Sequence, residues 1–128
     1  MKSLTLSIFL FILPVLTLED VEASIADAIR TGSASGVSKY FGDNVYMKIL
    51  DKEDVYSKPQ AELILKDFFS KHAPKTFTVD HSGVSKNGAK FTIGKLVTSA
   101  GTYKAYFLLK KEGEKFTIQQ FRIETDTD

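Results

Sequence analysis

The sequence contains no cysteine among its 128 residues. This absence excludes disulfide bonds, thiolate metal sites, a cysteine nucleophile and a lipid-modified cysteine anchor. Tryptophan is also missing, so the aromatic side chains are ten phenylalanines and five tyrosines, a composition that suits a β-rich core. The formal net charge is only +1, so no strong basic field favours nucleic acid as a partner.

Motifs for metal or cofactor binding are also lacking. The two histidines, His72 and His81, belong to no HExxH pattern, so we expect no zinc site. DKED (51–54) carries three carboxylates but lacks a glycine-centred calcium loop, and a solvated turn is the favoured interpretation. No GxSxG, Walker or dinucleotide-binding glycine motif occurs. We therefore predict neither a metal nor a cofactor.

The one long apolar run lies at the start of the sequence. It extends from Leu4 to Leu16 and follows Lys2, as in a secretory signal. The run is shorter than the roughly 20 residues needed to span a bilayer. We expect residues 1–17 to be a signal peptide cleaved after Thr17, with a cut after Ala23 as an alternative. A buried first helix or an uncleaved anchor is disfavoured, because the run has almost no polar face. The expected location is the periplasm or the exterior, with no stable membrane anchor after cleavage.

Residues 18–128 read as a single domain in which helices come first and strands follow. Apolar spacing predicts helices over 18–30, over 35–41 and from Ser57 or Lys58 onward. Alternation predicts one strand over 44–50 and a brief second strand at 55–56. Four further strands, joined by tight turns, are predicted over 76–85, 90–98, 102–110 and 115–124. This order predicts an α+β fold with three N-terminal helices packed on a strongly curved antiparallel sheet that ends in a four-strand meander.

The last predicted strand has a phase slip. Phe116 and Ile118 occupy even positions, whereas Phe121 and Ile123 occupy odd ones. One extra residue at Gln119–Gln120, a β-bulge, would bring all four side chains to one face. The alternative is a strand that is buried on both faces.

The same alternation assigns inward-facing residues to two of the preceding strands. We expect His81 to share the helix-facing side with Phe77 and Val79, and Lys95 to share it with Phe91 and Ile93. His81 is either a general base or pocket hydrogen-bonder, or a core-edge histidine with one partner. The second interpretation is favoured, because no second catalytic group stands beside it in the sequence. Lys95 reaches the open end of the fold, or else pairs with a carboxylate or contacts a ligand.

The third helix is expected to form one wall of a cavity. Ser57 and Gln60 fit a capping box at its start. Its apolar stripe includes Phe68 and Phe69 and faces the sheet, with Tyr56 at the rim. No catalytic residue is expected. The candidate pocket-lining residues are Tyr40, Tyr56, Phe68, Phe69, His81, Lys95 and Tyr103.

Several segments resemble a known bacterial family. They are DVYSKPQAELILKDFF (54–69), PKTFTVDHSG (74–83), FTIGKL (91–96), YKAYFLLKK (103–111) and IQQFRIE (118–124). They resemble the exported family known as domain of unknown function 4783, within the nuclear transport factor 2-like superfamily of cone-shaped α+β folds. The resemblance implies that fold, export and a cavity between helices and sheet. It implies no reaction, because the superfamily contains isomerases and dehydratases as well as plain binding modules.

Three functions remain open at this point. The favoured one is a small exported binding or accessory module that holds an apolar or amphipathic ligand between the third helix and the sheet. The second is a protein-interaction module that docks a partner or forms a homodimer through the open sheet face, motivated by the outward-facing Tyr106 and Leu108. The third is an isomerase- or dehydratase-like enzyme using His81.

Overall fold

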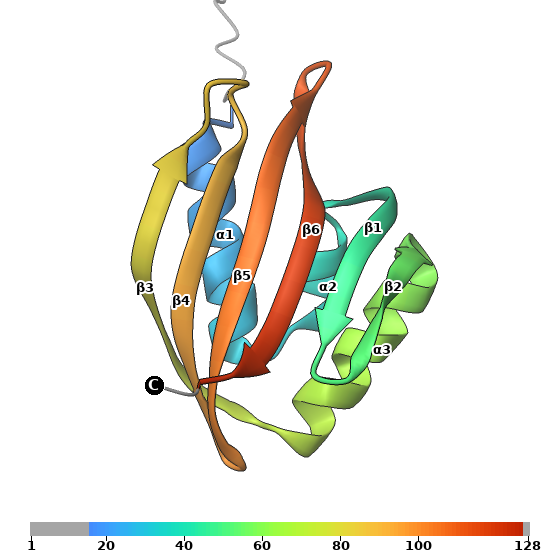
Figure 1. Ribbon diagram of the computed structural model, residues 1–128, viewed down its shortest axis with the longest axis vertical. Helices are drawn as coiled ribbons and strands as arrows, with labels where there is room; N and C mark the ends of the chain where they lie inside the picture. Colours follow the sequence, from blue (N-terminus) through green and yellow to red (C-terminus); the bar gives the residue numbers. More distant parts are fainter. Residues whose placement is uncertain (1–15, 127–128) are drawn as a thin grey trace, which may run out of the picture.

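Three helices lie on one face of a six-stranded sheet in the computed structural model, which describes residues 16–126 (Figure 1). The helices are α1 (Leu18–Thr31), α2 (Ala34–Ser38) and α3 (Lys58–Lys71). The strands are β1 (Phe41–Ile49), β2 (Lys52–Ser57), β3 (Pro74–Val84), β4 (Lys90–Thr98), β5 (Gly101–Glu112) and β6 (Lys115–Thr125). The predicted α+β architecture is confirmed. Most of the predicted signal peptide lies outside the described residues.

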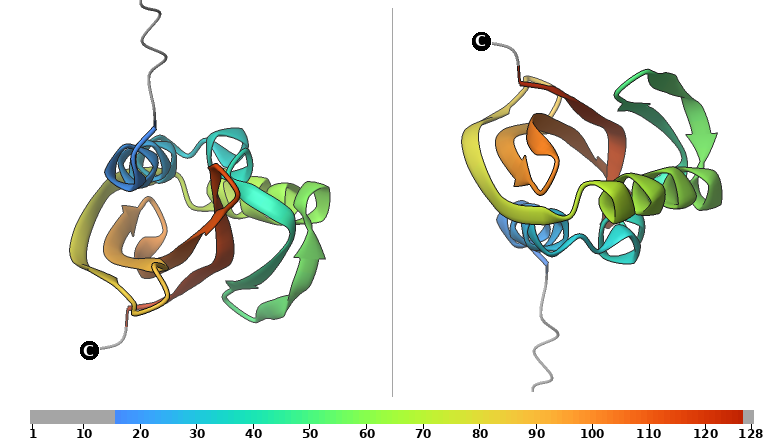
Figure 2. Two further views of the ribbon diagram at one scale, coloured as in Figure 1. Left: turned by 90° about the horizontal axis from the view of Figure 1, so that it is seen from above. Right: turned by 90° about the horizontal axis from the view of Figure 1, so that it is seen from below.

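The strands are arranged in the order β2-β1-β6-β5-β4-β3. β3 to β6 form the predicted antiparallel meander. β1 pairs with β6 in parallel, which the expectation of a purely antiparallel sheet did not include. The sheet curls strongly when it is viewed from either end (Figure 2). α1 packs on β3 and β4, α3 packs on β1 and β2, and α2 contacts both other helices. The face toward the helices is called the inner face below, and the opposite face the outer face.

The predicted bulge in β6 is present. Leu108 of β5 pairs with Gln120, whereas Leu109 pairs with Ile118, so Gln119 is the extra residue. The insertion restores the alternation beyond it. The inner face of β6 therefore carries three fully buried side chains, those of Ile118, Phe121 and Ile123.

A second bulge, in β3, overturns the predicted orientation of His81. Val79 pairs with Gly94 of β4, but His81 pairs with Ile93, so Asp80 is the extra residue. A side chain two residues after an inward one normally faces inward again, and the inserted Asp80 breaks that rule. His81 consequently lies exposed on the outer face.

The predicted faces of β4 are also reversed. Thr92 and Leu96 are fully buried on the inner face, whereas Lys95 is exposed on the outer face. The inner face needs a small residue at Gly94, because the ring of Phe77 occupies the space where a Cβ atom would stand. The alternation pattern predicted the wrong face because the more apolar of the two sets of alternating side chains, the set that includes Ile93, lies on the outer face.

The helix ends follow local sequence signals. Thr17 caps α1: the N–H of Asp20 donates to the Thr17 hydroxyl, and the N–H of Thr17 donates to the Asp20 carboxylate. The predicted capping box of Ser57 and Gln60 starts α3, with Pro59 in its first turn. A signal peptide cut after Thr17 would remove the cap of α1, and such caps stabilise a helix by about 1 kcal/mol.

The second helix is shorter than predicted. It ends at Ser38, and Phe41 already begins β1 and is buried against the ring of Phe121, with 6.1 Å between the ring centroids. Phe41 therefore contacts the sheet as part of β1, whereas the sequence pattern had placed it on one face of the second helix.

The inner sides of the helices and sheet close over one core, whose fully buried side chains include Ile25, Val37, Met47, Leu65, Phe107 and Phe121.

Candidate functional site

Aromatic side chains fill much of the space between α3 and the sheet where a cavity was predicted. Phe68, Phe69 and Tyr103 all belong to the buried core. The ring centroid of Phe68 lies 5.5 Å from that of Tyr103 and 6.0 Å from that of Phe69. His72 stacks on Phe68 at 4.2 Å, and its Nδ1 atom lies 2.9 Å from the Phe68 carbonyl oxygen at the end of α3. In this structure these aromatic side chains pack against one another, and His72 also contacts the carbonyl group at the end of α3.

The seven candidate pocket residues do not come together at one site. His81 and Lys95 are exposed on the outer face of the sheet. Tyr56 is half-buried against the edge of the core. Tyr40 lines the largest of the three pockets described for this structure, and Phe68 lines the smallest, a pocket of about 260 Å³ between α3 and the β1–β2 turn.

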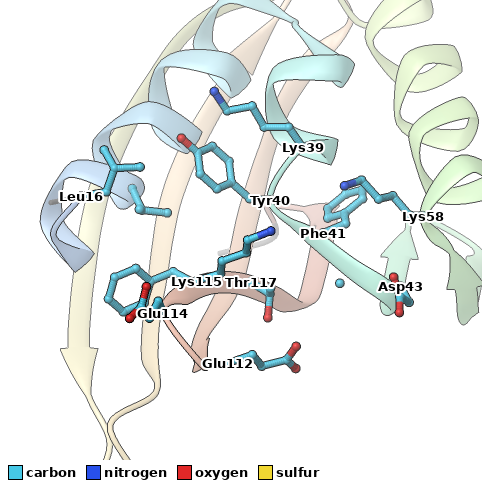
Figure 3. A pocket seen from close by; sticks show the side chains of 13 residues that line it. Leu16, Lys39, Tyr40, Phe41, Asp43, Lys58, Glu112, Glu114, Lys115 and Thr117 are labelled. Carbon is cyan, nitrogen blue, oxygen red and sulfur yellow. The ribbon is translucent and has the colours of Figure 1, made fainter. Parts of the chain in front are cut away.

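That pocket has a volume of about 520 Å³ and opens at one end of the domain. It lies where the start of α1, the junction between α2 and β1, and the β5–β6 hairpin meet (Figure 3). Its lining residues are Leu16, Val21, Lys39, Tyr40, Phe41, Gly42, Asp43, Lys58, Glu112, Glu114, Lys115, Phe116 and Thr117. We call it the hairpin pocket.

Apolar side chains form the inner wall of the hairpin pocket. Val21 and Phe41 are buried in the core beneath it. Tyr40 and Phe116 are half-buried and pack against the same core, although they are far apart in the sequence. Leu16 is exposed beside them, and a signal peptide cut after Thr17 would remove it. A ligand entering here would therefore contact an aromatic and aliphatic surface made by α1, the α2–β1 junction and β6.

Charged side chains surround that wall. Lys39, Lys58 and Lys115 contribute ammonium groups (Figure 3), and none of the three forms an ion pair with any residue between 16 and 126. The Lys39 Nζ atom lies 5.1 Å from the ring centroid of Tyr40, within the range of a cation–π contact. Two carboxylates of the rim, those of Asp43 and Glu114, are also without an ion pair in this part of the chain.

The third rim carboxylate is held by the protein. Glu112 accepts a hydrogen bond of 2.7 Å from the side-chain amide of Gln119, the residue inserted at the bulge of β6. The bulge thus connects the sheet to the rim of the hairpin pocket. The rim thus carries three ammonium groups and three carboxylates, since a hydrogen bond from a neutral amide leaves the charge of Glu112 in place, and this balance favours a ligand with a zwitterionic head.

The lining contains few side chains of the kinds that act in nucleophilic catalysis. Its only side-chain hydroxyls are those of Tyr40 and Thr117, and it includes no histidine. Nucleophilic catalysis needs a hydroxyl or thiol beside a positioned base. Between residues 16 and 126, no group of three or more His, Asp and Glu side chains is placed to hold a metal ion.

Sequence reasoning missed the hairpin pocket apart from Tyr40. Its residues come from segments near positions 16–43, 58 and 112–117, which are far apart along the chain. The signal available in the sequence was the alternation of Lys and Glu next to Phe116, in KKEGEKF. That turn was predicted, but its approach to the start of α1 depends on how the sheet curls.

The described helices include none that is both long enough and apolar enough to cross a bilayer. No curated protein matches the sequence.

Solved structures show close relatives in sequence and fold. A DUF4783 family protein from Bacteroides ovatus is 30% identical, with a TM-score of 0.77, over 83% of this chain and 96% of that one. A DUF4783 family protein from Bacteroides uniformis is also 30% identical, with a TM-score of 0.77, over 83% of this chain and 97% of that one. An NTF2-like protein of unknown function from Cytophaga hutchinsonii shares the fold at 15% identity, with a TM-score of 0.61 over 84% and 88% of the two chains.

The family model described as "Domain of unknown function (DUF4783)" matches residues 22–124, which include nearly all of the sheet and most of α1. With its six-stranded curved sheet and its likeness to NTF2-like structures, this chain belongs to the DUF4783 family and has an NTF2-like fold.

Proposed function

We propose that this protein is a small exported binding module that holds an amphipathic ligand in the hairpin pocket. The observation that carries the proposal is the pairing of an apolar wall, including Tyr40 and Phe116, with a rim of ammonium and carboxylate groups in a pocket of about 520 Å³. Pockets of a few hundred Å³ with apolar walls and a few polar groups are typical small-molecule sites. The apolar run before residue 17 supports export.

The ligand has an apolar body and a zwitterionic head. Its body would replace water on the half-buried rings of Tyr40 and Phe116, and burial of apolar surface stabilises the complex by about 25 cal/mol per Å². Its head would lie near the ammonium group of Lys115 and the carboxylate of Glu114. A head with charge of only one sign would also meet like charges on the rim and bind more weakly.

The first experiment measures thermal stabilisation by matched amphiphiles. Dodecanoate, a zwitterionic dodecylphosphocholine and dodecyltrimethylammonium share one alkyl chain and differ in head-group charge. Used below their micelle concentrations, dodecylphosphocholine should raise the melting temperature in a saturable manner, and by more than either singly charged amphiphile. Native mass spectrometry of protein isolated from the cell envelope then shows whether a ligand of this class is retained.

A matched pair of variants locates the site. Phe116→Ala removes part of the pocket wall, whereas Phe91→Ala removes a half-buried phenylalanine on the outer sheet face, away from the pocket. Binding of dodecylphosphocholine should weaken in the first variant and persist in the second. Equal binding in both variants, or no stabilisation of the wild type by any amphiphile, contradicts the proposal.

One observation favours the interaction module as a second candidate. Tyr106 and Leu108 lie half-buried on the outer face, next to Phe91 and Ile93 of the neighbouring strand. Light scattering over a range of protein concentrations tests for a homodimer through this face.

The enzyme hypothesis has no comparable support, because exposed His81 is on the outer face and does not line the hairpin pocket.

A further inference from the structure

The guanidinium group of Arg122 lies between two tyrosine rings on the outer face of the sheet. Its Cζ atom is 5.1 Å from the ring centroid of Tyr46 in β1 and 5.7 Å from that of Tyr106 in β5. Arg122 itself belongs to β6, which separates those two strands, and it is paired directly with Tyr106. Two aromatic contacts hold the planar cation in place and reduce the entropy lost when it binds a further group.

This held cation has no hydrogen-bond acceptor within residues 16–126. Its Nε atom is buried without a partner, and Arg122 takes part in none of the ion pairs of that region. Glu124 lies two residues further along the same face, but its carboxylate is 3.2 Å from the Nζ atom of Lys48. A half-buried arginine normally has an acceptor, because leaving charged donors unpaired away from water is costly.

A pocket of about 350 Å³ opens beside the guanidinium group. Its lining residues are Ile93, Lys104, Tyr106, Gln120, Arg122 and Glu124. Lys104 adds a second cation that forms no ion pair with the described residues. Ile93 and the ring of Tyr106 supply an apolar wall next to the two cations.

We propose that this outer-face pocket binds an oxyanion, a carboxylate or phosphate group, on the terminal nitrogens of Arg122 with Lys104 as the second cation. Because Nε is buried, the ligand must approach end-on, toward the two Nη atoms. That end of a guanidinium presents two N–H donors whose spacing matches two oxygens of one carboxylate or phosphate. The remainder of the ligand would lie on Ile93 and Tyr106.

The proposal does not depend on the hairpin pocket. The outer-face pocket is on the side of the sheet away from the helices, and the two sets of lining residues share no member. Failure of one proposal would therefore leave the other standing.

The test is a titration followed by amide chemical shifts of β4, β5 and β6. Sodium phosphate and sodium succinate are added separately, with sodium chloride at equal ionic strength as the reference. We expect saturable shifts around Arg122 and Tyr106 with at least one of the two anions, and the comparison between them identifies the preferred oxyanion. Shifts that sodium chloride reproduces, or no saturable shift with either anion, overturn the proposal.

Variants separate specific recognition from general attraction. Arg122→Gln should weaken the binding of the anion by about tenfold or more, since it removes the charge and the paired donors. Arg122→Lys keeps the charge but loses the paired donors, so its affinity should fall between those of the wild type and Arg122→Gln. Lys104→Gln should also weaken binding. Lys95→Gln is the matched control. Lys95 is exposed on the same face and lies opposite Lys104 on the neighbouring strand, but it does not line the pocket.

Two outcomes contradict the assignment even if anions bind. Equal weakening by Lys95→Gln and Lys104→Gln would show a diffuse electrostatic effect. Unchanged affinity in both Arg122→Lys and Lys104→Gln would place the anion elsewhere. Both of these variants retain a long polar side chain, so they test the assignment even if Arg122→Gln does not fold. Amide chemical shifts that change with protein concentration and not with anion concentration would indicate that a second copy of the chain binds this face.

Discussion

Lys90 of β4 holds the carboxylate of Glu22 of α1 in a nearly buried ion pair. The Lys90 Nζ atom lies 2.9 Å from Glu22 Oε2, with side-chain exposures of 12% and 17%. The hydroxyl of Thr92, 70 residues along the chain from Glu22, donates to the same oxygen at 2.9 Å. These bonds connect the first helix to the inner face of the meander. They are the polar contact that complements the apolar packing of α1 on β3 and β4.

Replacing Lys90 by methionine should destabilise the fold by about 1–3 kcal/mol, because it leaves the Glu22 carboxylate poorly solvated and without its cation. Urea denaturation measures the change. Lys71→Met is the matched control, since Lys71 forms an exposed i,i+4 pair with Asp67, and such pairs contribute about 0.5 kcal/mol or less. Equal effects of both substitutions would show that the Glu22 pair is no more important than a surface pair.

Gly94→Ala should destabilise the protein by about 1–3 kcal/mol through overpacking. A Cβ atom at this position would stand 2.5 Å from two ring atoms of Phe77 and 2.8 Å from the carbonyl oxygen of Thr78. The ring would have to leave the core, and the carbonyl belongs to the backbone of the neighbouring strand. Gly42→Ala is the control, because its nearest contact would be an ordinary 3.5 Å. Thermal denaturation of both variants checks the prediction, and a stable Gly94→Ala protein would refute the close approach of Phe77.

Phe68→Ala should cost about 3–5 kcal/mol of stability, as is typical for a phenylalanine removed from a core. Phe68 is 3% exposed and contacts the rings of Phe69, His72 and Tyr103. Leu63 on the same helix is 66% exposed, so Leu63→Ala should change stability by about 0.5 kcal/mol or less. Denaturant titration of the two variants tests whether α3 is a structural helix. A melting temperature unchanged by Phe68→Ala would contradict that role.

The bulges at Gln119 and Asp80 show which irregularities a sequence reveals. Around Gln119, apolar residues change from even to odd positions, so the amino-acid pattern alone indicates the inserted residue. Around Asp80 there is no such slip, because the segment TFTVDHSG alternates without interruption. The insertion there is set by the pairing of β3 with β4. Exposed His81 was therefore placed on the wrong face.

The faces of some candidate site residues could be predicted, but the position of a pocket could not, for a related reason. Phe68, Phe69 and Tyr103 were correctly assigned to the inner side of their elements, but inward-facing residues either line a cavity or fill it. Which of the two occurs depends on the volumes of all facing side chains together. Here Phe107, Phe121 and their neighbours belong to the buried core, and the largest of the three described pockets lies at the hairpin end.

The sequence by itself determined the type and order of the helices and strands, the capping box of Ser57 and Gln60, and the bulge at Gln119. These depend on interactions between residues a few positions apart, so the local pattern carries them. Tertiary structure decided the parallel pairing of β1 with β6, the inner face of β4 and the position of both pockets. Those features depend on how distant segments pack, because a strand's two faces differ only through what lies against each of them.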